Sequence, residues 1–247
     1  MQETLICNGA VLSVMAIGEA DRRLLLLTKE MGKISCFARG ARKVTSPFVG
    51  KTRPFSFGKF EIYPGRDSYS LHSAEIREYF DPVVRDPVKS ALGSCFLELV
   101  SQVAQENTDG TKLLRLLYYA LRAAENGKME PDTILTVFQA KLLQEEGALM
   151  EFENCAKCGK PLQKARFLPS YMNVLCEECV PEDRGIRLSP GALHALRFLE
   201  RSDEAHLFSF NLEESVKAEV ASVVKILLSR ILPKPLLAEE LFRQLIS

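Results

Sequence analysis

The hydrophobic pattern of the chain changes its period once, near residue 80, and this change constrains the fold more than any other feature. Before it, apolar residues lie in short alternating runs separated by turn residues, which is typical of β-strands. After it, apolar residues recur every three or four positions, as at Leu92, Phe96, Leu99 and Val103, and this spacing places them on one face of a helix. The pattern predicts an α+β multidomain chain with a β-domain over 1–80 and a helical domain over 81–247.

The first 80 residues contain five predicted strands. A bend is expected at Asn8 and Gly9 in the first strand, and tight turns are expected at 29–32 and 64–67. Five short strands in a segment of this size suggest a small closed barrel, and the five-stranded barrel that binds oligonucleotides is the OB-fold, although other small barrels share the pattern. The expected strands are 4–16, 22–28, 33–38, 55–63 and 69–76.

The remaining residues read as helices with one cysteine-rich interruption. Start signals such as Asp86-Pro87 and Glu130-Pro131 precede two of the apolar periodic segments. We expect the domain boundary near Phe80, Asp81 and Pro82. The expected helices begin at 87 and cover 111–125, 133–146, 190–200, 213–232 and 236–245.

Four cysteines in the interruption have the spacing of a zinc site. Cys155 and Cys158 form one C-x2-C pair, and Cys176 and Cys179 form a second pair after a gap of 17 residues. Four thiolates complete a tetrahedral shell, so the site is predicted to hold one structural zinc ion per chain within a segment at 151–184. A redox dithiol is the alternative, although it normally uses one pair beside a βαβ unit. Cys7, Cys36 and Cys95 lie on apolar patterns and are expected to be buried and inert.

Basic residues gather between the third and fourth predicted strands. The net charge is zero over the whole chain, but residues 28–66 carry nine Lys and Arg against Glu30 and Glu61. Such a local field is the usual footprint of a polyanion partner, whereas a merely solvated surface is the alternative. The predicted DNA-binding residues are Lys33, Arg39, Arg42, Lys43, Lys51, Arg53, Lys59 and Arg66.

Aromatic residues are interleaved with these charges, and aromatic rings beside cations are how single strands are often held. A small barrel also needs large side chains in its core, so most of the rings are expected to be buried. A bulge at Gly58 would bring Phe55 and Phe57 to the same face as Phe60 and Ile62. The aromatic set is Phe37, Phe48, Phe55, Phe57, Phe60, Tyr63 and Tyr69.

Signals for catalysis are weak, and the chain is predicted not to be an enzyme. The segment 45–52 resembles a phosphate loop, but Thr45 replaces its first glycine and Pro54 falls where the helix should run. The three histidines, His72, His194 and His206, are isolated along the chain.

No apolar run approaches the length of a membrane span, and the N-terminus has no secretory signal. We therefore expect a cytoplasmic chain without a membrane partner. In that reducing compartment, seven cysteines indicate metal ligands or free thiols more than disulfides.

These features together resemble the RecO family of bacterial recombination mediators over nearly the whole chain. The resemblance depends on the turn Thr28-Lys29-Glu30-Met31-Gly32-Lys33, the run Ala38-Arg39-Gly40-Ala41-Arg42-Lys43, the turn Pro64-Gly65-Arg66 and the paired cysteines. Residues 171–174, Tyr-Met-Asn-Val, depart from the glycines of the family at the second knuckle.

The resemblance implies an OB-fold that binds single- and double-stranded DNA and anneals complementary strands. It implies that the chain works with RecR and single-stranded-DNA-binding protein to load RecA during gap repair, in association with the nucleoid. A zinc-stabilised adaptor for protein interactions, without a direct role on DNA, is the alternative from another class. A DNA-processing enzyme would need a nucleophile or catalytic metal that the sequence does not reveal.

Overall fold

The computed structural model describes residues 4–66, 68–180, 185–209 and 211–246. Two parts of the predictions lie outside the described residues: Asp67 of the turn at 64–67, and residues 181–184 at the end of the zinc segment.

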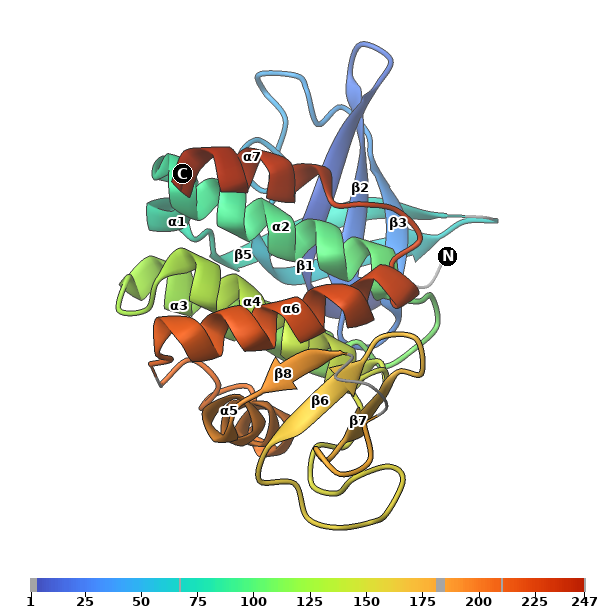
Figure 1. The fold of residues 1–247 in the computed structure, drawn as a ribbon. Coiled ribbons are helices and arrows are strands. Elements are labelled where there is room, and N and C mark those ends of the chain that lie inside the picture. Colours follow the sequence, from blue (N-terminus) through green and yellow to red (C-terminus); the bar gives the residue numbers. More distant parts are fainter. Residues whose placement is uncertain (1–3, 67, 181–184, 210, 247) are drawn as a thin grey trace. The chain divides into compact units, whose positions relative to one another are not determined.

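Five strands near the N-terminus form a closed barrel (Figure 1). Their order around the barrel is β1-β2-β3-β5-β4, and pairing between β4 and β1 closes it. The pairing is antiparallel except between β3 and β5, which run parallel. This closed five-stranded, OB-like barrel confirms the predicted fold class. The strands are β1 (Leu5–Ile17), β2 (Asp21–Thr28), β3 (Gly32–Ala38), β4 (Phe57–Pro64) and β5 (Tyr69–Glu78).

Two glycines face each other where the barrel closes. Gly9 of β1 is the register partner of Gly58 of β4. A Cβ on Gly9 would lie 2.3 Å from the carbonyl oxygen of Leu27, and one on Gly58 would lie 2.1 Å from that of Glu75. Strands at this point are therefore too close for any side chain at either position.

The first strand is continuous through the bend that was predicted at Asn8 and Gly9. Both residues stay in register with β4, and the irregularity lies further along, between Val11 and Ser13. The prediction of a bend at Gly9 is therefore wrong. Glycine is needed there for the close approach of the neighbouring strand, and not for a turn.

The pairing of β4 with β5 shifts its register between Phe57 and Gly58, but the extra residue lies on β5, at Arg77. Phe60 and Ile62 lie in the barrel core, as predicted. Phe57 is also buried, but its ring lies edge-on to those of Phe80 and Tyr118. β4 stays in regular register with β1 through Phe57 and Phe60, so these two rings lie on opposite faces of the strand. The prediction that a bulge brings them to one face is therefore wrong.

Contacts divide the chain into two compact units. The first contains Met1–Glu125 and Leu236–Ser247, and the second contains Asn126–Pro235. The first unit therefore adds four helices to the barrel, and the expected separation into domains 1–80 and 81–247 stays a prediction. These helices are α1 (Asp81–Arg85), α2 (Pro87–Val103), α3 (Thr111–Asn126) and α7 (Leu237–Ile246).

Backbone hydrogen bonds join the barrel to the loop between α2 and α3. The amide of Lys33 donates to the carbonyl of Gln105 at 2.9 Å, and the amide of Gly110 donates to the carbonyl of Lys29 at 3.0 Å. Gly32 in this turn has φ of 65°, and a Cβ on it would lie 2.2 Å from the carbonyl oxygen of Gln105. The β2–β3 turn is therefore held inside the first unit.

The final helix, α7, packs against α2. The carboxylate of Glu98 on α2 accepts hydrogen bonds from the amides of Leu237 and Ala238, at 3.1 and 2.8 Å. A carboxylate at this point satisfies amides that the first turn of a helix leaves free and interacts favourably with the helix dipole.

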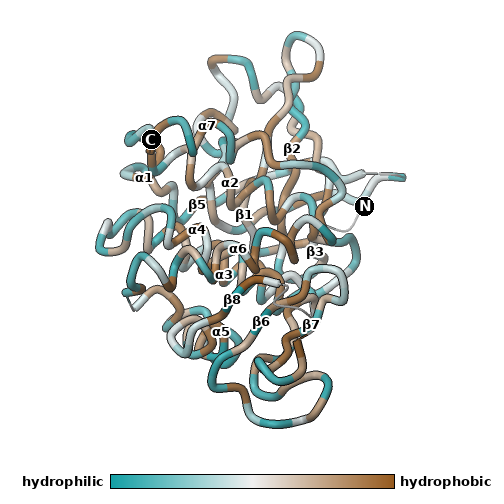
Figure 2. The backbone as a smooth tube through the Cα atoms, viewed as in Figure 1, coloured by the Kyte–Doolittle hydropathy of each residue, from teal (hydrophilic) through white to brown (hydrophobic). Residues whose placement is uncertain are grey.

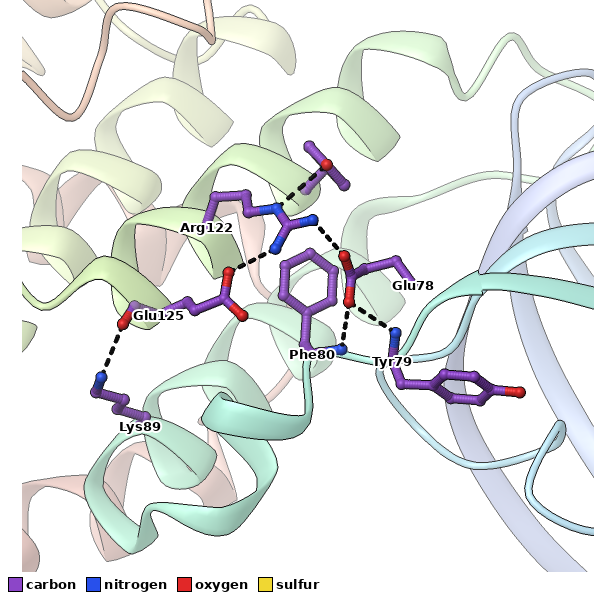
Figure 3. A network of polar contacts seen from close by, with 7 residues as sticks. Glu78, Tyr79, Phe80, Lys89, Arg122 and Glu125 are labelled. Atoms are coloured by element: carbon purple, nitrogen blue, oxygen red, sulfur yellow. Dashed lines mark hydrogen bonds and ion pairs between the residues drawn. The ribbon is translucent and has the colours of Figure 1, made fainter.

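A polar network centred on Arg122 links α3 to the end of β5 (Figure 3). The guanidinium pairs with Glu78 and with Glu125 and lies 4.9 Å from the centre of the Phe80 ring. Glu78 also accepts the amides of Tyr79 and Phe80, at 2.9 and 3.0 Å. Partial burial raises the pKa of Glu78, but these amides and Arg122 outweigh burial and hold the pKa below its usual value. The network holds Phe80, which has a left-handed conformation with φ of 51° and immediately precedes α1.

The second unit is built on α4, whose residues are nearly all buried and which packs against α5 and α6. The predicted helices are confirmed here, but the sequence analysis missed a small antiparallel sheet within the cysteine-rich segment. Its strands have only three or four residues, which is too short for an alternating pattern to be recognised. The elements are α4 (Pro131–Glu145), β6 (Ala165–Leu168), β7 (Asn173–Leu175), β8 (Ile186–Leu188), α5 (Pro190–Arg201) and α6 (Glu214–Ile231).

Hydrophobic residues are spread over many elements, and Figure 2 shows hydrophilic stretches in the loops between them. In the parts of the chain that the structure describes, every helix is too short or too polar to cross a membrane.

Replacing Gly58 by alanine tests the closure of the barrel. Gly58→Ala is expected to lower the free energy of unfolding by about 3 kcal/mol or more, because its methyl group would meet backbone atoms that cannot rotate away. Urea denaturation followed by circular dichroism measures the change. Met15→Ala, at an exposed position of β1, is the control and should shift the value by about 0.5 kcal/mol or less. A Gly58→Ala chain as stable as the wild type would contradict the close approach.

Candidate metal centre and nucleic-acid interface

The four predicted zinc ligands lie together in the second unit. Their sulfur atoms are all within 4.8 Å of one another, and the Sγ atoms of Cys158 and Cys176 are 3.7 Å apart. A zinc–sulfur bond is about 2.3 Å, so two sulfurs on a tetrahedral ion lie about 3.8 Å apart. The sulfurs of Cys155, Cys158, Cys176 and Cys179 therefore fit a single metal ion of this kind.

Backbone hydrogen bonds shape each pair of cysteines into a turn. The amide of Gly159 donates to the carbonyl of Cys155 at 2.9 Å, and the amide of Cys179 donates to that of Cys176 at 3.0 Å. Gly159 has φ of 71°, which explains the glycine after the second cysteine of the first pair. The amide of Cys176 also points at the Sγ atom of Cys155, at 3.4 Å, and so links the two turns.

The electrostatics of the cluster favour a thiolate at Cys155. Burial raises the pKa of its thiol, but the amides of Cys176, Cys158 and Lys157 outweigh burial and lower the pKa to about 6. Deprotonated sulfur is the form that binds metal. The three cysteines outside the cluster are different. Cys7, Cys36 and Cys95 are fully buried, and burial raises the pKa of each to about 12. These three thiols are buried, as predicted, and burial disfavours the reactive thiolate form.

The basic residues between β3 and β4 lie in a loop at 39–56 made of successive turns. Lys43, Ser46, Val49 and Lys51 each donate an amide hydrogen to the carbonyl three residues earlier, at 3.0 to 3.2 Å. Ala41, Phe48 and Thr52 are buried and attach the loop to the barrel, so the predicted loop is present and ordered. We call residues 39–53 the basic loop.

The turn between β1 and β2 holds the first half of the basic loop. The carboxylate of Asp21 accepts the amide of Gly40 at 2.7 Å. Arg42 donates its amide to the carbonyl of Ala20 at 2.9 Å and its guanidinium to the carbonyl of Gly18 at 2.6 Å. At the other end of the loop, the guanidinium of Arg22 donates to the hydroxyl of Thr52 at 2.9 Å. Four hydrogen bonds thus fix the conformation in which the loop presents its charges.

The structure separates the eight predicted DNA-binding residues into three groups. Arg39, Arg42 and Lys43 are exposed in the basic loop, with Lys51 half-buried in the same loop. Arg66 is exposed in the turn between β4 and β5, and Lys59 is half-buried on β4 opposite Glu75.

The remaining two cations are half-buried and are also bound to other groups of the protein. The ammonium of Lys33 donates to the carbonyl of Ser101 at 2.8 Å. Arg53 pairs with Asp81, and its guanidinium lies 4.7 Å from the centre of the Tyr79 ring. Asp81 therefore neutralises part of the charge that the sequence analysis counted in the basic loop.

One exposed cation outside the predicted set lies on the surface of β2. Arg23 donates to the hydroxyl of Ser35 at 2.7 Å, and its guanidinium lies 5.9 Å from the centre of the half-buried Phe37 ring. The Arg22-Arg23 pair at the start of the strand was the available sequence signal, but it precedes the charged segment.

Comparison with known proteins assigns the chain to a family. A family model described as "Recombination protein O N terminal" matches residues 1–80, and one described as "Recombination protein O C terminal" matches residues 84–240. The chain belongs to the RecO family. It is 31% identical to the DNA repair protein RecO of Acetivibrio thermocellus over 219 residues, which are 87% of each chain. It is 29% identical to that of Clostridium novyi over 241 residues, 96% of this chain and 93% of the relative.

Membership in the RecO family confirms the resemblance and places the chain among DNA repair and recombination proteins. The family models meet between residues 80 and 84, close to the change of hydrophobic period. The phosphate-loop resemblance at 45–52 ends without a helix, since Gly50, at φ of 77°, is followed by turns.

Replacing Cys176 by serine tests the metal centre. Cys176→Ser is expected to reduce the zinc content from about one ion per chain to near zero, because three thiolates hold the ion much less tightly than four. Metal analysis of protein purified without chelator measures the content, and a thermal melt reports the loss of stability.

Cys95→Ala is the matched control, since Cys95 is buried in the first unit and should leave the zinc content unchanged. Wild-type protein without zinc, or a Cys176→Ser chain that melts like the wild type, would contradict the assignment.

Proposed function

We propose that this RecO-family chain is a mediator of recombination that binds single- and double-stranded DNA without sequence specificity. The observation that carries the proposal is the basic loop, which is anchored at both ends and presents Arg39, Arg42, Lys43 and Lys51. Residues 31–60 contain no Asp or Glu. Any carboxylate that weakens the positive potential of these cations therefore comes from another part of the chain. A fixed group of cations of this kind suits a phosphate backbone, which offers regularly spaced charges and no base-specific pattern.

The proposed DNA contacts are centred on the basic loop. We propose Arg66 in the β4–β5 turn, Lys59 on β4 and the exposed Arg23 on β2 as further contacts outside this loop. Lys33 and Arg53, which bind other groups of the protein, are assigned a secondary contribution.

The same loop would allow annealing of complementary strands. The phosphates of two strands repel each other. A surface with several cations lowers this repulsion because it neutralises phosphates on both strands and releases their counterions. The annealing activity needs no nucleophile or catalytic metal, so we propose that the chain acts by binding and not as an enzyme.

The zinc ion would support the fold of the second unit and take no part in DNA contact. A four-thiolate shell has no open position for water or substrate. The proposed partners, by virtue of family membership, are RecR, single-stranded-DNA-binding protein and, indirectly, RecA, in the cytoplasm at the nucleoid.

A salt titration tests the electrostatic proposal. If about four phosphates are neutralised on a single strand, the slope of log K against log salt is roughly −2.8, because each phosphate contributes about −0.7. Arg42→Glu with Lys43→Glu should weaken binding strongly, flatten this slope and abolish annealing of oligonucleotides coated with single-stranded-DNA-binding protein.

Lys128→Glu with Lys225→Glu is the control, since both lysines are exposed in the second unit and outside the basic loop. Equal affinity and slope for the wild type and the loop variant would favour the alternative of a protein-interaction adaptor.

A further inference from the structure

The basic loop exposes apolar side chains among its cations. Val44 is 95% exposed and Val49 is 57% exposed, and Pro47 between them is exposed as well. Their neighbour Phe48 has the opposite orientation and is buried in the barrel core. Single exposed valines are common on protein surfaces, so the surroundings decide whether these have a role.

The exposure of these valines does not result from a loosely held segment. Val49 donates its amide to the carbonyl of Ser46 at 3.2 Å, and Ser46 donates its own amide to the carbonyl of Lys43 at 3.0 Å. The hydroxyl of Ser46 also accepts the amide of Phe48 at 3.2 Å. The two valines therefore stand on a set of linked turns with a buried anchor between them, and ordering them on a ligand would cost little further entropy.

A second exposed apolar pair lies on the segment that holds the loop. Met15 is 54% exposed and Ile17 is 37% exposed, immediately before the turn whose Gly18 carbonyl accepts the guanidinium of Arg42. Figure 1 shows the β1–β2 hairpin and the loop after β3 projecting from the same end of the barrel. Figure 2 shows a hydrophobic stretch close to the tip of this hairpin. Exposed apolar side chains thus occur both on the β1–β2 hairpin and on the basic loop that it holds.

Most of the barrel aromatics are not available for stacking on bases, although Phe37, Tyr63 and Tyr69 are only half-buried. Phe48, Phe55, Phe57 and Phe60 are all less than 10% exposed, as the sequence analysis expected for most of the rings. Within the basic loop the one aromatic residue, Phe48, is buried, so apolar contact with a base there would come from aliphatic side chains.

We infer that Val44 and Val49 form an apolar contact with the unstacked bases of a single strand whose phosphates the surrounding cations bind. This inference rests on the proposed function and names the part of the DNA that the loop recognises besides phosphate. The positive charge around the valines indicates that the ligand in contact with them is a polyanion. Arg42 and Lys43 precede Val44, and Lys51 follows Val49, with no acidic residue between 31 and 60. Proteins that bind duplexes in the minor groove insert apolar side chains beside Arg and Lys and must unstack base pairs to do so, whereas a single strand offers its base faces without that cost.

The contact would distinguish single strands from duplexes. In a duplex the faces of the bases are stacked and covered, whereas a single strand exposes them to an apolar side chain. A strand held by its phosphates with its bases turned toward an aliphatic surface keeps the base edges free for pairing. That orientation suits a protein that brings two complementary strands together.

An oligonucleotide without bases tests the inference directly. The two probes are oligothymidylate of about 16 nucleotides, the upper end of OB-fold site sizes, and an abasic oligomer with the same number of phosphates. Fluorescence anisotropy at one salt concentration gives both affinities. The wild type is expected to bind oligothymidylate about tenfold more tightly, the equivalent of about 1.4 kcal/mol.

The variant Val44→Ser with Val49→Ser should lose this preference and bind both probes as the wild type binds the abasic one. Val44→Thr with Val49→Thr keeps the side-chain shape and should show an intermediate preference, which guards against a change in loop conformation. Leu241→Ser is the matched control, because Leu241 is 55% exposed on α7 and lies outside the basic loop. It should retain the full preference.

The outcomes separate the inference from the proposed function. Tight binding of both probes by the wild type without preference would overturn the inference and leave electrostatic DNA binding intact. A full preference in the serine variant would also overturn it and point to a protein partner for these valines. Failure of the wild type to bind either probe would contradict the proposed function itself.

Discussion

Closure of the barrel by pairing between β1 and β4 is the constraint on which the rest of the first unit depends. Gly9 and Gly58 permit it, because neither position has room for a methyl group beside the next strand. Closure fixes the start of β2, from which Asp21 and Arg22 reach the two halves of the basic loop. The conformation of the charged segment is therefore a consequence of strand register, and not of the loop sequence alone.

The two sites obtain their rigidity in different ways. The basic loop is held by short-range turns and by neutral and charged hydrogen bonds to a finished barrel, and it needs no ligand to be ordered. The cysteine turns are joined by strands of only three or four residues. The four sulfur atoms lie close enough together to bind a single metal ion. On the proposed function, metal binding there would stabilise the second unit, whereas DNA would bind to a loop that the barrel already holds in place.

Local patterns predicted most of the elements but not their partnerships. The five strands, the long helices and the four clustered cysteines follow from period, turn residues and spacing, which depend on neighbours in the sequence. The association of α7 with α2 depends on Glu98 meeting amides about 140 residues away, and no local signal contains that contact. The same limit applies to Arg53, which pairs with Asp81, and to Lys33, which donates to the Ser101 carbonyl, because neither contact is visible in the local sequence.

We propose that the basic loop, whose conformation is fixed by the barrel, is the surface that binds single-stranded DNA. Backbone amide chemical shifts of the full-length protein, followed during titration with oligothymidylate, test this most directly. The account predicts that the largest changes fall within residues 39–53 and in the β1–β2 turn, while residues 155–179 change little. Largest changes in the second unit, with the basic loop unperturbed, would contradict it.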